Sequence, residues 1–393
     1  MKKQLKKAAK SVMLFCYRIM ASLLPIDKKV IVFNSSMGRN YTGNPRYIYE
    51  YMVEKGLDKK YQCIWFFESL PKELPGNYKI VRFKRIKYFY YMAIAKTWVF
   101  DCRQPDFLVK KKNVTYIQTW HGTPLKKLAL DMDSVSMAED KDIEKYKNKF
   151  YQNAQTWDYL IAQNDFSAKI FRKAFGFEKE MLTIGYPRND ILIRNNTKEY
   201  IESLKKELEL PMDKKIILYA PTWRDNEFYG SGRYKFNPHI DFELLKEQLE
   251  DEYCIIVKYH YLVKDLVDWS PYKGFIFDCD LNYDISLLYL VSDILITDYS
   301  SVMFDYSILK RPMLFYCYDY DNYKNNLRGF YFDFEKEAPG PISYETKELI
   351  QDILHYDEAK YIEKYSAFSK KYNEVESGTA SEKICKLIEE TSK

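Results

Sequence analysis

The sequence predicts an α/β protein with two doubly wound domains and an N-terminal amphipathic helix. The length of 393 residues suits two domains of ordinary size. Short β-prone runs alternate with helical stretches over most of the chain, which is typical of parallel sheets covered by helices. A charged helical segment at residues 195–209 interrupts this alternation, which then starts again. We therefore expect a helix within residues 1–27, a first domain at 28–195, and a second domain with a helical tail at 212–393.

The composition is typical of a chain that is folded throughout. Hydrophobic residues make up 47% and charged residues 30%, and only 13 glycines and 14 prolines are present, so long linkers and disorder are not expected. The seven cysteines are scattered without a C-x-x-C pair, which suits a reducing cytoplasm and argues against disulfides or a zinc site. A net charge of +5 is too diffuse to indicate nucleic-acid binding, although it is compatible with an anionic substrate or a membrane.

The first 27 residues predict a helix that lies on a membrane surface. Basic residues precede an apolar run that is shorter than the roughly twenty residues a membrane-spanning helix needs. On a helix, the polar side chains share one stripe and apolar side chains cover the rest. This polar stripe consists of Lys3, Lys7, Ser11, Arg18 and Ser22. Such a helix is expected at the interface of an anionic leaflet. A secretory signal peptide has a similar basic start, but no small-x-small cleavage site follows here.

The first domain is expected to contain a parallel sheet. Its strand candidates are residues 29–33, 62–67, 79–83, 97–100, 114–117 and 159–163. The loop at 34–44 contains glycines and leads into a helix at 45–56, but it matches neither G-x-G-x-x-G nor a P-loop, so it predicts an ordinary turn. Good capping residues at 164–167 precede a helix that should end at Phe175, and residues 182–188 close the domain.

The second domain repeats the alternation of strands and helices. Strands are expected at residues 215–219, 253–258, 275–277, 293–297 and 313–316, the last of the sheet. A helix should follow the fourth of these strands and run to Leu309. Most of the tail at residues 347–393 should also be helical.

His121 is the first candidate for a catalytic residue. A β-prone run at 114–117 precedes it, and Pro124 fixes its own φ at a value that suits the first turn of a helix. We therefore expect His121 in a tight strand-to-helix turn, which is where ligands bind in open α/β sheets. An imidazole titrates near neutral pH and can accept the proton of an attacking hydroxyl. A purely structural turn residue is the alternative.

Polar side chains follow several strands of the second domain, and the carboxyl ends of those strands gather at one edge of the sheet. The candidates for binding an anion are Thr222, Arg224, Lys258, His260, Ser300, Ser301 and Arg328. Hydroxyl and guanidinium groups suit phosphate oxygens, although ordinary N-capping would also explain the two serines. Asp305 lies one helical turn beyond them, where it could accept substrate hydroxyls or favour the helix N-terminus. No spacing predicts a metal site, so phosphoryl transfer here would depend on Arg, Lys, His and helix N-termini to offset charge.

Six motifs, taken together, resemble one family. They are TWHGTPLK, GYPRND, YAPTWR, the histidine that ends YCIIVKYH, ITDYSSVMFDYSILKRPMLFY and RGFYFDF, and they extend over nearly the whole chain after the first helix. In these motifs the sequence is similar to the CDP-glycerol glycerophosphotransferases that build wall teichoic acid in Gram-positive bacteria. The resemblance implies a GT-B-like fold, in which two Rossmann-like domains face each other across a cleft.

The resemblance also implies a reaction. A hydroxyl of a membrane-bound acceptor attacks the glycerol-side phosphorus of CDP-glycerol, CMP leaves, and a phosphodiester forms without a cofactor. His121 matches the histidine that acts as general base, and His260 matches a second histidine that steadies the transferring phosphate or pyrophosphate. The positions that match the CDP-glycerol side are Thr222, Arg224, Ser300, Ser301, Asp305 and Arg328. The family usually has proline after the second histidine, whereas this chain has Tyr261, so the role of His260 is less defined.

The acceptor is the least determined part of this interpretation. The basic helix suits an acceptor carried on undecaprenyl diphosphate at the cytoplasmic face of the membrane, where other teichoic acid enzymes could be partners. Because longer polymerases of the family carry extra sequence before the transferase unit, the resemblance favours a primase that adds the first glycerol phosphate. An elongating transferase, a CDP-ribitol transferase, a GT-B nucleotide-sugar glycosyltransferase and a non-catalytic membrane scaffold are the alternatives. Many glycosyltransferases have paired acids in the second domain, where this chain has DYSS.

Overall fold

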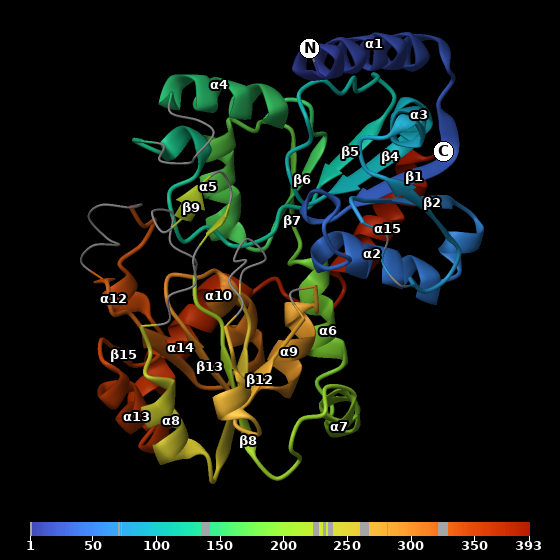
Figure 1. Cartoon of the computed structure of the whole chain (residues 1–393). Helices are drawn as coiled ribbons and strands as arrows, with labels where there is room; N and C mark the ends of the chain where they lie inside the picture. Colours follow the sequence, from blue (N-terminus) through green and yellow to red (C-terminus); the bar gives the residue numbers. More distant parts are fainter. Residues whose placement is uncertain are drawn as a thin grey trace.

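Two α/β lobes form the molecule in the computed structural model, and helix α1 lies across the outer surface of the first lobe (Figure 1). The structure describes residues 2–69, 71, 73–134, 142–222, 228–230, 233–234, 239–259, 267–280, 282–320 and 329–393. The chain crosses between the lobes twice, first after the last strand of the first sheet and again before the C-terminal helix, so the C-terminus lies beside the first lobe (Figure 1).

The first lobe contains seven parallel strands in the order β3-β2-β1-β4-β5-β6-β7. They are β1 Asp27–Asn34, β2 Gln62–Phe67, β3 Tyr78–Arg82, β4 Ala95–Phe100, β5 Thr115–Gln118, β6 Tyr159–Ala162 and β7 Glu180–Thr183. Apolar residues fill the central strands because helices cover both faces of the sheet, and β2 leaves only its first residue exposed. The parallel sheet expected for this half is confirmed, and each of the six strand candidates coincides with a strand to within a few residues.

The helices of the first lobe are α1 Lys2–Leu23, α2 Gly43–Glu54, α3 Ile86–Ile94, α4 Ile143–Ala154 and α5 Asp165–Phe175. Helix α5 begins and ends where its capping residues require. The Asn164 side chain accepts a hydrogen bond from the Ser167 amide at 2.8 Å, and Gly176 ends the helix with a φ of 57°. The predicted caps of this helix are therefore confirmed.

In the part of the second lobe that the structure describes, one sheet has six parallel strands in the order β12-β11-β8-β13-β14-β15. They are β8 Lys215–Tyr219, β11 Tyr253–Val257, β12 Ile276–Asp278, β13 Ile294–Thr297, β14 Met313–Tyr316 and β15 Ile342–Ser343. Separately, β9 Phe228–Gly230 pairs antiparallel with β10 Arg233–Tyr234. The prediction that residues 313–316 are the last strand is wrong, because a further strand of two residues, β15, pairs with β14 at the edge of the sheet. Two residues are too few to produce an alternating pattern that the sequence could reveal.

The helices after the first sheet are α6 Asp190–Arg194, α7 Lys198–Glu207, α8 Phe242–Leu249, α9 Ile285–Val291, α10 Val302–Tyr306, α12 Phe334–Glu337, α13 Thr346–Leu354, α14 Glu358–Asn373 and α15 Ala380–Thr391. The tail is thus largely helical, as expected. Its last helix, α15, packs Ile384, Cys385 and Ile388 into the core of the first lobe beside α2. The domain limits expected from the sequence remain predictions, and this contact assigns α15 to the first lobe in space.

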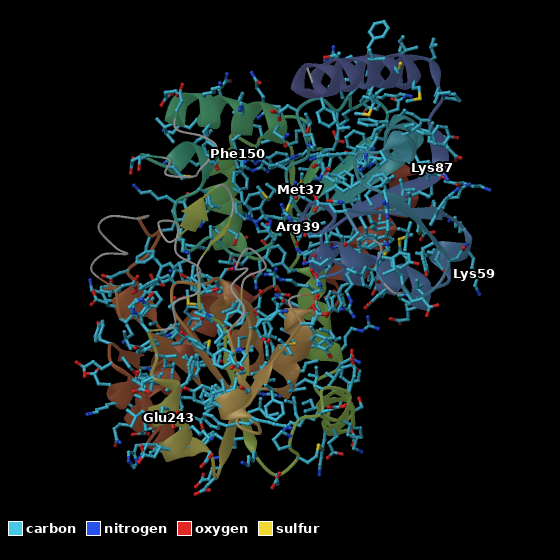
Figure 2. The ribbon with its side chains drawn as sticks, in the orientation of Figure 1. Met37, Arg39, Lys59, Lys87, Phe150 and Glu243 are labelled. Atoms are coloured by element: carbon cyan, nitrogen blue, oxygen red, sulfur yellow. The ribbon has the colours of Figure 1, made fainter. Side chains whose placement is uncertain are left out.

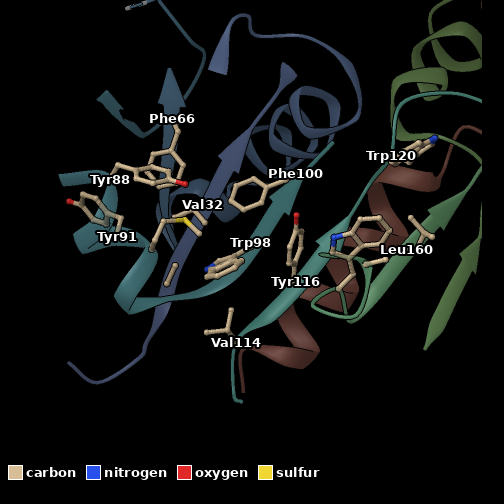
Figure 3. Packing of buried hydrophobic residues seen from close by; sticks show 14 of the residues in the cluster. Val32, Phe66, Tyr88, Tyr91, Trp98, Phe100, Val114, Tyr116, Trp120 and Leu160 are labelled. Atoms are coloured by element: carbon tan, nitrogen blue, oxygen red, sulfur yellow. The ribbon is translucent and has the colours of Figure 1, made fainter. Parts of the chain in front are cut away.

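Aromatic side chains fill much of the core of the first lobe (Figure 3). Phe66 and Tyr88 meet edge to face with ring centroids 4.7 Å apart, and Trp98 lies 5.5 Å from Tyr116. Burying one such side chain stabilises a fold by roughly 2–3 kcal/mol. The loops at the strand ends are therefore anchored on a closely packed core.

The strand order places one crevice in each lobe. In both sheets the order reverses direction once, between β1 and β4 in the first and between β8 and β13 in the second. Loops that leave neighbouring strands in opposite directions open a crevice at the carboxyl ends of those strands, where ligands bind. The loop after β1, marked by Met37 and Arg39 in Figure 2, belongs to the first of these crevices.

The chain after His121 differs from the expected helix. From Leu125 to Lys127 it is extended and pairs with the segment around Phe330 of the second lobe, where the Lys127 amide donates to the Gly329 carbonyl at 2.9 Å. Pro124 therefore begins no helix, and the strand-to-helix turn predicted for His121 is a strand-to-extended turn. The cause is a pairing partner about 200 residues away in the sequence, which local patterns cannot reveal.

Candidate active site

A cleft of about 330 Å³ lies between the two lobes. From the first lobe it is lined by residues that follow β1, β4 and β5, including Ser36, Asp101 and His121. From the second lobe it is lined by residues that follow β8 and β13, including Pro221 and Ser301. The two crevices predicted by strand order therefore form a single site, with His121 on one wall and the DYSS loop on the other.

The orientation of the His121 ring is fixed from two sides. It stacks on Trp120, with centroids 4.5 Å apart and planes at 24°. Its Nδ1 lies 2.8 Å from the Asp101 carbonyl oxygen. Because a carbonyl can only accept, Nδ1 carries the proton and Nε2 keeps its lone pair. Trp120 has a φ of 51°, a strained conformation for a bulky residue that tends to occur at functional sites.

The surroundings of His121 favour its neutral form. The residue is exposed to the cleft, and desolvation by the surrounding protein lowers the pKa of His121 below its ordinary value of 6.5. The cations Arg188 and Arg103 lower that pKa further, while the bond to Asp101 opposes them. A neutral imidazole with a free Nε2 is the state that a general base needs.

Asp101 ties the His121 wall to the loop after β1. Its carboxylate accepts the Ser36 amide at 2.9 and 3.1 Å, and burial raises its pKa to about 6. Ser36 and Met37 have φ values of 47° and 59°, and Gly38 follows with 85°. A non-glycine pair in the left-handed region is costly, and the Asp101 contact helps to hold it in place.

The two walls of the cleft touch at Gly122 and Ser301. A Cβ on Gly122 would lie only 2.8 Å from Ser301 Oγ, so a larger residue here would displace the Ser301 side chain. Ser301 occupies the N-cap position of α10, but its side chain makes no capping hydrogen bond, and Ser300 Oγ accepts the Val302 amide only at 3.5 Å. N-capping therefore does not account for the Ser301 hydroxyl, which faces the cleft.

Two further residues of the second lobe have defined positions near the cleft. Thr222 follows β8, and its amide donates to Asp298 at 2.9 Å. Lys258 follows β11, is largely buried, and donates from Nζ to the Asp280 carbonyl at 2.6 Å. Burial lowers the pKa of Lys258. The other predicted site residues, Arg224, His260 and Arg328, lie outside the residues that the structure describes.

Arg188 and Asp284 line the cleft, yet neither was predicted to be a site residue. Arg188, within the GYPRND motif, donates to the His121 carbonyl at 2.9 Å and lies 2.5 Å from Asp305. Asp284 caps α9 and also accepts hydrogen bonds from Gly43 and Tyr47 of the first lobe at 2.9 and 3.1 Å. The GYPRND motif contains Arg188, but no motif contains Asp284. Both roles depend on partners in the opposite lobe, which sequence patterns do not reveal.

The fold and the cleft define a class of protein. Two doubly wound domains that face each other across a cleft constitute a GT-B-like fold, as expected from the sequence. The family model described as CDP-Glycerol:Poly(glycerophosphate) glycerophosphotransferase matches residues 16–390. The chain therefore belongs to the CDP-glycerol glycerophosphotransferase family of enzymes, which confirms the resemblance found in its motifs.

Individual relatives agree with this assignment. The chain is 48% identical over 364 residues to the teichoic acid poly(glycerol phosphate) polymerase of Bacillus spizizenii, with 92% of both chains covered. It is 43% identical over 378 residues to the teichoic acid glycerol-phosphate transferase of Staphylococcus aureus, covering 93% of this chain and 94% of that one. The solved structure of the wall teichoic acid polymerase TagF, H444N variant, matches with a TM-score of 0.91 and 42% identity, over 100% of this chain and 97% of that one.

Proposed function

We propose that this enzyme transfers glycerol phosphate from CDP-glycerol to a hydroxyl of a lipid-linked acceptor in teichoic acid biosynthesis and releases CMP. One observation carries the proposal. His121 lines the cleft, its Nδ1 is bonded to the Asp101 carbonyl so that Nε2 is left as the basic nitrogen, and the adjacent Gly122 lies against Ser301 of the opposite wall. A phosphate held at Ser301 would therefore lie beside the base.

The reaction can be followed atom by atom. The acceptor hydroxyl gives its proton to His121 Nε2, and its oxygen attacks the phosphorus of the glycerol phosphate. The bond between this phosphorus and the oxygen that bridges to CMP breaks, and CMP leaves with the electron pair. The proton on His121 is then released to water. The negative charge that gathers on the transferring group requires donors that are already in position.

We assign those donors to the second lobe. The hydroxyls of Thr222, Ser300 and Ser301 would bind phosphate oxygens, and Arg224, His260 and Arg328 remain predicted ligands. Asp305 was predicted to lie on the CDP-glycerol side. Its carboxylate is engaged by Arg188 and by Asn189, at 2.5 and 3.0 Å, so we propose that it supports the binding wall from behind.

The acceptor is proposed to reach the enzyme at the membrane through α1. This helix buries Tyr17 and Ala21 against the first lobe and packs beside α3 (Figure 1). It leaves an apolar stripe in solvent, in which Phe15 is 64% and Leu23 77% exposed; the other members are Val12 and Ile19. No helix among the described residues is long and apolar enough to cross a membrane. An exposed apolar stripe on a basic helix suits the interface of an anionic leaflet.

Elongation is the second candidate for the step catalysed. The Bacillus spizizenii polymerase is 48% identical to this chain, whereas the teichoic acid glycerol-phosphate primase of Bacillus subtilis is 34% identical over 77% of it. This difference favours elongation over the priming step expected from the sequence. Transfer of ribitol phosphate has weaker support, because the ribitol-phosphate primase of Bacillus spizizenii is 31% identical.

CMP release tests the proposal. CDP-glycerol and CDP-ribitol would each be supplied with an unprimed lipid-linked disaccharide or with the same acceptor already carrying one glycerol phosphate. Release from CDP-glycerol that stops after one unit on the unprimed acceptor would establish priming, and release only with the primed acceptor would establish elongation. The absence of CMP release in every combination would refute glycerol-phosphate transfer and favour the nucleotide-sugar glycosyltransferase alternative.

A further inference from the structure

Arg188 lies at the point where the chain first crosses between the lobes, in a short 3-10 turn at Pro187–Asn189. Its Nη1 donates to the His121 carbonyl at 2.9 Å, and its Nη2 lies 2.5 Å from Asp305 Oδ2. The pair is shielded from water, since the Arg188 side chain is 11% exposed and the Asp305 side chain 2%. One guanidinium thus joins the turn that carries the candidate base to a helix of the other lobe.

The same residue helps to fix three consecutive carbonyls of the His121 turn. The Arg188 amide donates to Asn44 Oδ1 at 3.1 Å, and Asn44 Nδ2 donates to the carbonyls of Thr119 and Trp120 at 3.1 and 3.0 Å. Arg188 Nη1 completes the set at His121. Trp120 has a left-handed backbone, and such a strained residue persists only where the surrounding contacts determine its conformation.

On the opposite wall, Asp305 belongs to α10, the helix that begins after Ser301. Its second oxygen accepts the Asn189 side chain at 3.0 Å, so neighbouring residues of the crossing segment hold both oxygens. Because Ser301 Oγ lies within contact distance of the Gly122 position, the ion pair and this close approach together set the spacing between the base and the DYSS loop.

We propose that Arg188 is a positioning residue for the transfer reaction, which holds the His121 turn in register with α10 through Asp305. The role rests on the proposed function, because register matters only if His121 acts on a group bound at the DYSS loop. A guanidinium is suited to the task, since its planar fork can donate to a carbonyl and a carboxylate at once. Displacement of a catalytic group by about 1 Å can cost on the order of 100-fold in rate.

The first test measures the titration of His121 directly by NMR of the full chain labelled at its four histidines, with His121→Gln to assign the signal. The charged groups around the ring are Arg188, Arg103 and Asp101. Arg188→Gln removes a cation and should raise the pKa of His121. Asp305→Asn leaves Arg188 uncompensated and should lower it. A general loss of structure would not move the two variants in opposite directions.

The second test measures turnover with CDP-glycerol. Arg188→Gln should lower kcat by roughly 100-fold with little change in KM, and Arg188→Lys should recover part of the loss, because it keeps the charge without the fork. The matched control is Arg194→Gln. Arg194 lies at the end of α6, close to Arg188 in the sequence, but its ion pair with Glu54 at 2.9 Å is exposed to solvent. The control variant should leave both kcat and the titration of His121 unchanged.

The outcomes distinguish a failure of the proposed transfer reaction from a failure of the positioning role of Arg188. If the wild-type chain releases no CMP, the proposed function fails, while the NMR titration still tests the contact itself. If the wild type is active but Arg188→Gln keeps its kcat and the pKa of His121, the positioning role is refuted. An effect of Arg194→Gln equal to that of Arg188→Gln would also refute the positioning role, because the loss of either arginine between residues 187 and 194 would then have the same effect.

Discussion

Glu376 should make the stability of this protein fall as the pH rises. The residue lies on the second crossing between the lobes, where its Oε1 accepts the Asn189 side chain at 2.7 Å and the Tyr186 amide at 3.2 Å. Burial raises its pKa from the ordinary 4.5 to about 8, and the negative charges of Asp305 and Asp190 act in the same direction. The carboxyl is therefore protonated in the folded protein at neutral pH.

The sign of the effect follows from proton binding. Between pH 4.5 and 8 the folded chain retains a proton that the unfolded chain has lost, so rising pH disfavours folding across that window, and above it the loss is constant. The difference between the two pKa values, at about 1.4 kcal/mol per pH unit, limits the loss to roughly 5 kcal/mol. Glu376→Gln keeps the acceptor oxygen and removes the ionisation, so it should remove the pH dependence.

Thermal unfolding followed from pH 4.5 to 9 would test this. For 393 residues, an unfolding entropy near 2.1 cal/mol/K per residue makes 1 kcal/mol equivalent to about 1 °C. The Tm of Glu376→Gln relative to wild type should rise by up to roughly 5 °C between the two ends of the range. The unpaired amide of the glutamine changes the Tm by an amount that does not vary with pH. The test is therefore how the Tm difference between variant and wild type changes with pH. A flat difference, or the same slope with exposed Glu374→Gln, would refute the reasoning.

Three further predictions concern the cleft and α1. His121→Ala should lower kcat by about 100-fold or more with little change in the affinity for CDP-glycerol; a loss confined to affinity would make His121 a binding residue. Gly122→Ala should lower kcat about tenfold at unchanged Tm, because the new Cβ would displace Ser301 by a few tenths of an ångström; wild-type kcat would mean that the two walls are farther apart during turnover. Phe15→Glu should weaken sedimentation with anionic vesicles, while Ser22→Glu, which adds the same charge on the polar stripe, should weaken it less; equal losses would argue for charge alone.

The sequence predicted the features that depend on local patterns. Continuous apolar runs identified β2, β8 and β14 to the residue, because strands buried on both faces leave such runs. Capping residues at 164–167 located the start of α5, because a side chain that accepts from the first free backbone amides is a local signal. His121 was found through its strand and its motif. The extended course after Pro124 could not be found, because it depends on pairing with Phe330.

Arg188 and Asp284 illustrate why the rest of the site was missed. A single arginine or aspartate in a turn has the same local signature whether it faces solvent or another domain. Their roles became visible only when the fold brought Asp305 next to one of them and Gly43 next to the other. Residues that link two domains are thus the part of a two-domain site that sequence patterns describe least.

The contacts between the lobes also indicate how substrates gain access. Two of the contacts beside the cleft are polar, namely Arg188 with Asp305 and Asp284 with Gly43, and another is aromatic, since Phe166 of the first lobe meets Tyr372 of α14 with ring centroids 5.2 Å apart. The contact of α15 with α2 is apolar and buried, so separating it would expose hydrophobic surface. Because Gly122 and Ser301 already touch, a nucleotide cannot pass between them unless the walls move apart. We therefore expect the walls to separate at Gly122 and Ser301 when the nucleotide enters, while α15 remains packed on the first lobe.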